Sequence, residues 1–188
     1  MSTYQLSLPL LSEHSADEDG SKLLNEAKTQ LGFIPNLYAM MANFPGLLET
    51  YRFGDMQFRQ SSGFSAIEQE VIYLTISITN ECHYCVAAHS TIATHQSHVP
   101  PSVIDAIRKG ETAPDNKLQA LTRFTRAIVI QRGMINNDEA QLFLEAGFTE
   151  KHILAVILAV GMKTLSNYTN HLANTPIDPA FEGQQWHP

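Results

Sequence analysis

The sequence is poor in cysteine and in charge. Only two cysteines occur among 188 residues, Cys82 and Cys85, so the chain lacks the disulfide framework of small secreted domains. A close cysteine pair instead indicates thiol chemistry in a reducing compartment. Charged residues make up 16%, against roughly 25% in an ordinary soluble domain. This deficit suggests that part of the surface is covered by a partner chain.

Positive charge and long apolar runs are also scarce. The net charge is -7, so phosphate backbones and anionic membrane surfaces are repelled on average, and we expect no nucleic-acid or membrane partner. The longest nearly apolar stretch, residues 153–162, has about half of the ~20 residues that cross a bilayer. Residues 1–11 lack the positively charged region and cleavage site of a signal peptide. These absences predict a soluble, cytoplasmic protein.

Helix-capping signals recur along the chain. Ser65 with Glu68 forms a capping box that opens a helix to Ile78. We expect a further helix from about Asn80 to Gln96, and a last, long one from Thr149 to about 172. No repeat or linker interrupts residues 1–188. The sequence therefore predicts a single all-α domain of roughly eight helices, with a core at about 65–97 and a polar C-terminal tail over 174–188.

The segment from Val71 to Ile78 allows a second interpretation. Its β-branched and aromatic residues suit a buried strand as well as a helix. A strand followed by a C-x-x-C sequence at the start of a helix is typical of thioredoxin folds. A thioredoxin sheet needs several more strands, and no other segment is a credible one. The capping box at Ser65 also favours the helix.

The two cysteines share a helical face with a histidine. In the expected helix from Asn80, the side chains of Cys82, Cys85 and His89 fall within about 60° of one another. Cysteines three residues apart on a helix are close enough to form a disulfide without a backbone rearrangement. The pair can therefore cycle between dithiol and disulfide.

The spacing leaves open which sulfur attacks a substrate. Cys82, at the start of the helix, gains most from the unpaired N–H groups and the helix dipole. Cys85 gains from His89, which lies one turn away, about 6 Å along the axis. His89 lies about 10.5 Å along the axis from Cys82. A base-assisted nucleophile is therefore Cys85, whereas a dipole-stabilised one is Cys82.

Glu70 stands where the pattern requires an apolar side chain. It shares a stripe at spacings of three and four with Ile67, Leu74 and Ile78. A buried carboxylate normally needs a partner. His89, beyond the following turn, is a candidate, because Glu70 would orient its imidazole and raise its basicity. This contact is tertiary and does not follow from spacing.

A metal site is the alternative use of the same residues. Zinc would take Cys82, Cys85 and His89 and needs a fourth ligand, such as His95 or His98. Both point away from His89 on the expected helix. We therefore favour redox chemistry over a structural zinc site.

Glu70, Cys82, Cys85 and His89 resemble the E-x11-C-x-x-C-x3-H signature of the alkyl hydroperoxidase D (AhpD)-like proteins. These proteins belong to the carboxymuconolactone decarboxylase superfamily. Segments 31–36, 120–126, 145–148 and 174–178 resemble its peroxidase-related branch, so the resemblance covers nearly the whole chain. It implies an all-α fold and homo-oligomers such as dimers, trimers or hexamers. It also implies thiol-dependent reduction of hydroperoxides or disulfides without haem, flavin or metal.

The resemblance also implies a role for each site residue. Cys85 would be oxidised by peroxide, and Cys82 would be the more accessible, resolving thiol. His89, supported by Glu70, would transfer protons. An external dithiol or lipoyl-type reductant would restore both thiols. The founding hydroperoxidase has a histidine where this chain has Tyr84, whereas His83 sits one position earlier.

The leading hypothesis is thus an alkyl hydroperoxidase with peroxiredoxin-type activity. The runner-up is a reductase or adaptor for lipoyl or protein disulfides. The decarboxylase branch is not built around a C-x-x-C pair, so that activity ranks lower.

Overall fold

A computed structural model describes residues 4–187, and all regular structure in that range is helical. The helices are α1 (Glu18–Leu31), α2 (Asn36–Met41), α3 (Pro45–Ser61), α4 (Ala66–Thr79), α5 (His83–His95), α6 (Pro101–Lys109), α7 (Asn116–Ile130), α8 (Asn137–Glu145), α9 (Glu150–Ala173) and the 3-10 helix η1 (Pro179–Gln184). The all-α, single-domain prediction is confirmed. The described residues form nine α-helices and one 3-10 helix, against the expected count of roughly eight, and η1 forms within the segment expected to be a polar tail.

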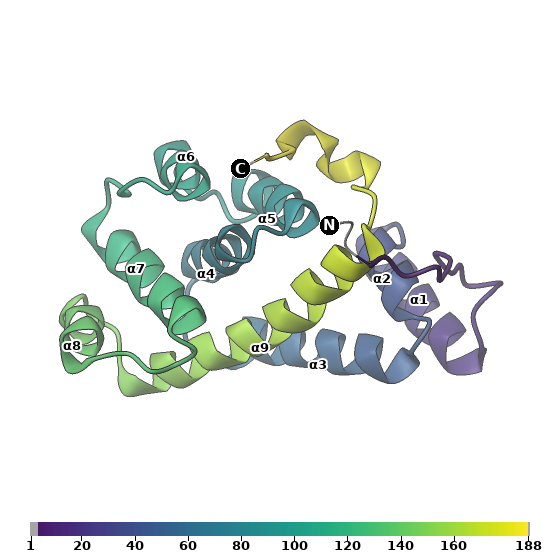
Figure 1. The fold of residues 1–188 in the computed structure, drawn as a ribbon, viewed down its shortest axis with the longest axis horizontal. Coiled ribbons are helices and arrows are strands. Elements are labelled where there is room, and N and C mark those ends of the chain that lie inside the picture. Colours follow the sequence, from purple (N-terminus) through teal and green to yellow (C-terminus); the bar gives the residue numbers. More distant parts are fainter. Residues whose placement is uncertain (1–3, 188) are drawn as a thin grey trace.

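Two helices organise the domain. α9 runs obliquely along much of the long axis, with α1 to α3 toward one end and α6 to α8 toward the other (Figure 1). α4 lies in the middle and packs against α5, α6, α7 and α9, while α3 packs along α9. Within residues 4–187 no helix is both long and apolar enough to cross a membrane.

α4 is a central, fully enclosed helix. Its capping box is present: the Ser65 hydroxyl accepts the Glu68 N–H at 3.3 Å, and the Glu68 carboxylate accepts the Ser65 N–H at 2.8 Å. Every residue from Glu68 to Ile78 is buried. The strand interpretation of this segment is wrong. Burial on all sides, rather than strand pairing, explains its β-branched and aromatic content.

The junction between α4 and α5 differs from the prediction. The expected helix from Asn80 begins only at His83, because Asn80 ends α4 and Glu81 adopts a left-handed conformation with φ 55°. The N–H of Cys82 donates to the Ser77 carbonyl at 2.9 Å, and Cys82 becomes the N-cap of α5. A left-handed residue interrupts a right-handed helix. Cys82 is therefore the N-cap of α5, whereas Cys85 and His89 lie one turn apart within the helix.

The C-terminal segment, residues 174–187, folds back over α5. Asp178 accepts the Tyr84 hydroxyl at 2.5 Å and the Asn36 N–H at 3.1 Å. Further along, the Trp186 carbonyl lies 2.8 Å from His83 Nδ1, and the Trp186 indole donates to the Arg108 carbonyl at 3.1 Å. This part of the expected polar tail thus covers one side of α5; Pro188 lies outside the described residues.

Candidate active site

The structure gathers the four predicted site residues into one buried cluster. Glu70 comes from α4, Cys82 from the N-cap of α5, and Cys85 and His89 from α5 itself. Their relative exposures are only 0%, 1%, 2% and 7% respectively. Neither thiol is in a disulfide. The cluster is closed on its far side by α9.

His89 links two charged residues. Its Nδ1 lies 2.9 Å from Glu70 Oε2, and its Nε2 lies 2.8 Å from the Nζ of Lys163 on α9. An ammonium group only donates, so Nε2 accepts and Nδ1 carries the proton that it donates to Glu70. Nε2 is therefore occupied by Lys163 and is not turned to Cys85.

Glu70 has a second charged partner on its other side. Arg59 of α3 forms an ion pair with Glu70 Oε1 at 2.5 Å, and its guanidinium lies 3.8 Å from Asp55. Asp55 accepts the Tyr73 hydroxyl at 2.8 Å. Arg59 is partly exposed, whereas Glu70 is fully buried. A line of alternating charges therefore runs from the surface at α3 to Lys163 beside the cysteines.

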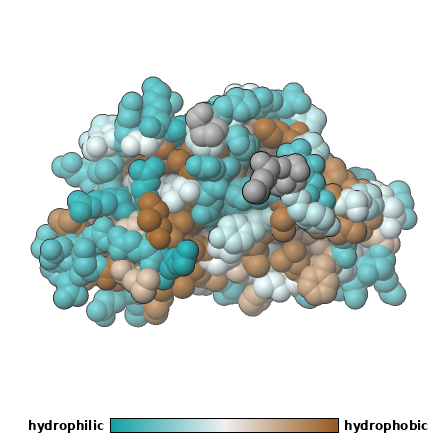
Figure 2. All heavy atoms as spheres, viewed as in Figure 1, coloured by the Kyte–Doolittle hydropathy of each residue, from teal (hydrophilic) through white to brown (hydrophobic). Residues whose placement is uncertain are grey.

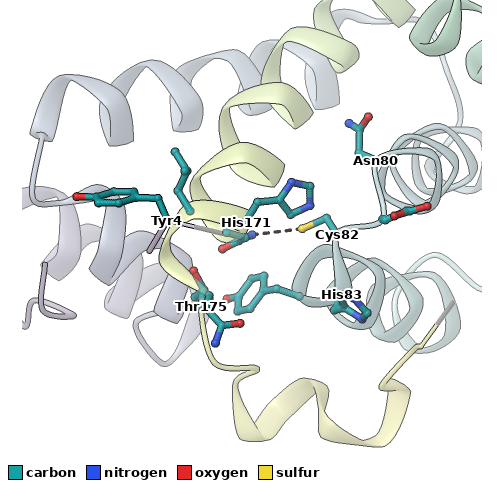
Figure 3. Close-up of a pocket in the computed structure, with 11 residues that line it drawn as sticks. Tyr4, Asn80, Cys82, His83, His171 and Thr175 are labelled. Atoms are coloured by element: carbon teal, nitrogen blue, oxygen red, sulfur yellow. Dashed lines mark hydrogen bonds between the residues drawn. The ribbon is translucent and has the colours of Figure 1, made fainter. Parts of the chain in front are cut away.

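α9 supplies the hydrogen bonds to the sulfur atoms. The Asn170 amide donates to Cys85 Sγ at 3.2 Å and to Cys82 Sγ at 3.7 Å. The dashed line in Figure 3 marks the second of these bonds. The Ser166 hydroxyl lies 3.9 Å from Cys85 Sγ. Lys163, Ser166 and Asn170 are spaced by three and four residues, so they share one buried face of α9.

The expected difference in accessibility between the cysteines is wrong for this chain. Both thiols are almost fully buried, because α9 and the C-terminal segment close over the start of α5. What differs is the pocket that each residue lines. Cys82 lines a pocket of about 600 Å³. Cys85, His89 and Lys163 line another, of about 310 Å³.

Known proteins share both the sequence region and the fold. A model of the carboxymuconolactone decarboxylase family matches residues 42–127, the segment that holds Glu70, Cys82, Cys85 and His89. The fold is similar to a crystal structure of an alkylhydroperoxidase AhpD core, an uncharacterized peroxidase-related protein from Ralstonia eutropha JMP134. The TM-score is 0.81 at 20% identity, over 93% of each chain. Residues 42–127 thus resemble the carboxymuconolactone decarboxylase family, and the chain has the fold of the AhpD-core structure.

Other structures with this fold differ in their described activity. One is an uncharacterized peroxidase-related protein from Silicibacter sp. TM1040, with a TM-score of 0.77 and 21% identity over 98% of this chain and 96% of that one. Another is a variant of the debrominase Bmp8 in complex with 2,3,4-tribromopyrrole, with a TM-score of 0.69 and 14% identity over 89% of each chain. A search of curated proteins finds no significant match. The superfamily fold therefore does not by itself fix the reaction.

The site separates the pKa values of its two thiols. Burial by itself raises the pKa of Cys85, but the hydrogen bond from Cys82 and the charge of Lys163 hold it well below its ordinary value. The same hydrogen bond, together with burial, raises the pKa of Cys82. The arrangement stabilises a thiolate on Cys85 next to a protonated Cys82.

The histidine and the glutamate of the site have fixed protonation states near neutral pH. Burial and the charge of Lys163 lower the pKa of His89, although Glu70 acts in the opposite direction. Burial raises the pKa of Glu70, but His89 and Arg59 outweigh it and hold the pKa below its ordinary value. The imidazole is therefore neutral and the carboxylate ionised, in agreement with the hydrogen bonds described above.

Sequence reasoning missed Lys163 and Ser166 of α9. Lys163, Ser166 and Asn170 interrupt the buried face of a helix that is otherwise largely apolar. Glu70 was recognised by the same kind of signal: it is a polar residue at a position that the helical spacing places in the core. The same search over residues 150–173 would have found Lys163. Arg59 carries no comparable signal, because it occupies the partly exposed side of α3.

The zinc interpretation fits this geometry poorly. Both ring nitrogens of His89 are bound, one to Glu70 and one to Lys163. A zinc-ligating histidine needs one nitrogen free of other donors. Among the residues that the structure describes, no three His, Cys, Asp or Glu side chains lie together in a way that would hold a metal ion.

Proposed function

We propose that this chain is a thiol-dependent peroxidase that reduces hydrogen peroxide or organic hydroperoxides through Cys82 and Cys85. The observation that carries the proposal is the environment of Cys85: a buried sulfur that accepts from Asn170 and lies in the field of Lys163, with a second thiol as its hydrogen-bond donor. These contacts favour the thiolate, which is the form that attacks a peroxide. The 310 Å³ pocket beside Cys85 provides room for the substrate.

In the first step, the Cys85 thiolate attacks one oxygen of the hydroperoxide. An S–O bond forms as the O–O bond breaks, which gives Cys85 sulfenic acid and an alkoxide. The alkoxide takes up one proton and leaves as an alcohol, or as water from hydrogen peroxide. We assign this proton to the Lys163 ammonium, which lines the pocket and is hydrogen-bonded to His89. His89, oriented by Glu70, positions this ammonium by accepting a hydrogen bond from it, and Lys163 regains its proton when the Cys85 thiol is re-formed at the end of the cycle.

In the second step, the Cys82 sulfur attacks Cys85 sulfenic acid. A disulfide forms and one water molecule is released. An external dithiol then reduces this disulfide to the two thiols and is itself oxidised to a disulfide. Each cycle thus consumes one hydroperoxide and one dithiol. The chain's own residues supply the thiolate, the resolving thiol and the proton transfer.

Stopped-flow oxidation of single-cysteine variants tests this assignment. We expect Cys85→Ser to lose rapid reaction with cumene hydroperoxide, whereas Cys82→Ser should react and accumulate a sulfenic acid that dimedone traps. In the wild type, the intact mass should fall by two hydrogens as the disulfide forms. A Cys85→Ser variant that reacts as fast as the wild type would contradict the proposal, and a dimedone adduct on Cys82 in the wild type would reverse the two roles.

A second candidate is a reductase or adaptor for lipoyl or protein disulfides. It is favoured by the larger volume of the pocket at Cys82, about 600 Å³ against about 310 Å³ at Cys85. Second-order rate constants for cumene hydroperoxide and for oxidised lipoamide, measured on the same reduced protein, separate the two. Faster reaction with lipoamide would make peroxide reduction incidental.

A further inference from the structure

Two pockets adjoin the cysteine pair, one lined by Cys82 and the other by Cys85. The pocket lined by Cys82, defined here as the Cys82 pocket, lies among the N-terminal segment, the start of α5 and the end of α9. The pocket lined by Cys85, the Cys85 pocket, also contacts α1, α2 and α3. Tyr84 lines both, and its hydroxyl is held by Asp178 at 2.5 Å. A fixed tyrosine therefore forms part of the wall between them.

We infer that the Cys82 pocket is the binding site of the dithiol reductant, separate from the Cys85 pocket through which hydroperoxide arrives. This inference rests on the proposed function, because it concerns the disulfide that the peroxidase cycle leaves behind. The ligand class is a small alkyl dithiol. The pocket combines residues that lie far apart in the sequence: 4, 80–84, 170–172, 174 and 175.

The chemistry of exchange directs the reductant to Cys82. A thiolate of the reductant attacks one sulfur of the Cys82/Cys85 disulfide in line with the S–S bond. The other sulfur leaves, and the sulfur that forms the more stable thiolate is the better leaving group. The contacts of Asn170 and Lys163 favour a thiolate on Cys85. Attack at Cys82 thus forms a mixed disulfide and releases Cys85. The second thiol of the reductant then displaces Cys82, so that two electrons and two protons reach the protein.

The Cys82 pocket carries groups that suit a thiol. In Figure 3 the Cys82 side chain points into it, toward α9 and His171. Asn170 donates to Cys82 through its amide nitrogen, while its amide oxygen is buried without a hydrogen-bond partner among the described residues. That oxygen is placed to accept an incoming S–H. The exposed side chains of Tyr4 and Leu172 offer apolar surface for an alkyl chain.

A matched pair of substitutions tests the separation. Leu172 lines the Cys82 pocket and Leu31 lines the Cys85 pocket, with similar exposures of 46% and 50%. Neither residue touches a sulfur. We expect Leu172→Trp to slow reduction of the oxidised protein by dithiothreitol at least about tenfold, while oxidation by cumene hydroperoxide stays within about twofold. Leu31→Trp should show the reverse pattern.

The oxidised protein for the reduction assay is prepared with diamide, so this half of the cycle does not depend on peroxide reactivity. If the wild type resists cumene hydroperoxide but Leu172→Trp still slows reduction by dithiothreitol, the proposed function fails and the reductant site stands. If Leu172→Trp leaves reduction unchanged, or both variants slow the same half-reaction, the inference is overturned while the peroxidase activity is unaffected.

Discussion

At the residue scale, Lys163 is the feature that most changes the chemistry of the site. It is 1% exposed, and no carboxylate among the described residues lies within ion-pair distance of its ammonium group. A buried charge without a counter-charge is costly. The Cys85 thiolate supplies the opposite charge, and the charge of Lys163 lowers the pKa of Cys85.

Replacing Lys163 by an apolar residue of similar length should therefore lower the reactivity of the Cys85 thiol. We expect Lys163→Met, in a Cys82→Ser background, to raise the pKa of Cys85, so that the pH at which its alkylation by iodoacetamide reaches half of the maximal rate moves upward. The rate measured from pH 5 to 10 gives the pKa directly. Lys163→Arg, which keeps the charge, is the control. An unchanged pH profile in Lys163→Met would exclude an electrostatic role.

His89 makes stability depend on pH. Because its pKa in the folded protein is lowered from 6.5, the unfolded chain binds a proton that the folded chain does not as pH falls below that value. The free energy of unfolding should then fall by up to about 1.4 kcal/mol per pH unit below 6.5, until the folded pKa is reached. Urea midpoints at pH 7.5, 6.5 and 5.5 measure this slope.

His89→Gln should flatten that dependence, whereas His14→Gln, at an exposed N-terminal position, should keep it. Glu70 remains ionised across this range, because its pKa lies below its ordinary value. If the urea midpoints of the wild type and of His89→Gln change with pH in parallel, a group other than His89 causes the pH dependence.

At the element scale, the contact between α3 and α9 brings the charged network of Arg59 and Glu70 close to the face of α9 that carries Lys163. Gly54 allows the close approach: a Cβ at this position would lie 2.0 Å from the Met162 sulfur. Met162 directly precedes Lys163 in the chain. The spacing of these two helices therefore helps to set the position of the ammonium group.

The same substitution on the two facing helices should have opposite effects. Gly54→Ala should lower the free energy of unfolding by about 1 kcal/mol, because overpacking against Met162 outweighs the gain in helix propensity. Gly161→Ala on α9, where a Cβ meets nothing within 4 Å, should raise it by about 0.5 to 1 kcal/mol. Urea unfolding of both variants measures the difference. Two stabilised variants would mean that Met162 moves aside freely.

At the scale of the whole molecule, apolar side chains remain uncovered on α3 and α9. Figure 2 shows apolar surface gathered over the region where these helices lie in Figure 1. Leu154 and Ile157 of α9 are 67% and 50% exposed, and Phe53 of α3 is 61% exposed. Clustered exposure of this kind marks an interaction surface. It accounts for the low content of charged residues, 16%, if a second copy covers this face.

We accordingly predict a homo-oligomer that depends on this face. Sedimentation equilibrium should give a mass that is a multiple of 20.9 kDa. The double variant Leu154→Glu with Ile157→Glu should sediment as a smaller species, because burying two carboxylates in an apolar contact is unfavourable. Leu142→Glu, at an exposed apolar position on α8, is the control. A wild-type protein that stays monomeric at micromolar concentration would leave the charge deficit without this explanation.

Local sequence signals predicted much of the fold. The capping box at Ser65 and the N-cap at Thr149 mark where α4 and α9 begin, because a cap depends on residues within one turn. Prediction failed at Glu81, whose left-handed conformation ends α4 and moves Cys82 off the helix. No residue type required that conformation: it is stabilised by the hydrogen bond from Cys82 to Ser77 and by the packing of two helices.

The sequence by itself determined the candidate site residues. Two lone cysteines and a histidine at helical spacing, with a carboxylate out of place in an apolar stripe, are recognisable because neighbours in a helix stay neighbours in the fold. Only the tertiary structure decided their partners. Arg59, Lys163 and Asn170 come from helices far away in the chain, and burial then fixed which sulfur is the thiolate, because charges interact strongly only where water is excluded.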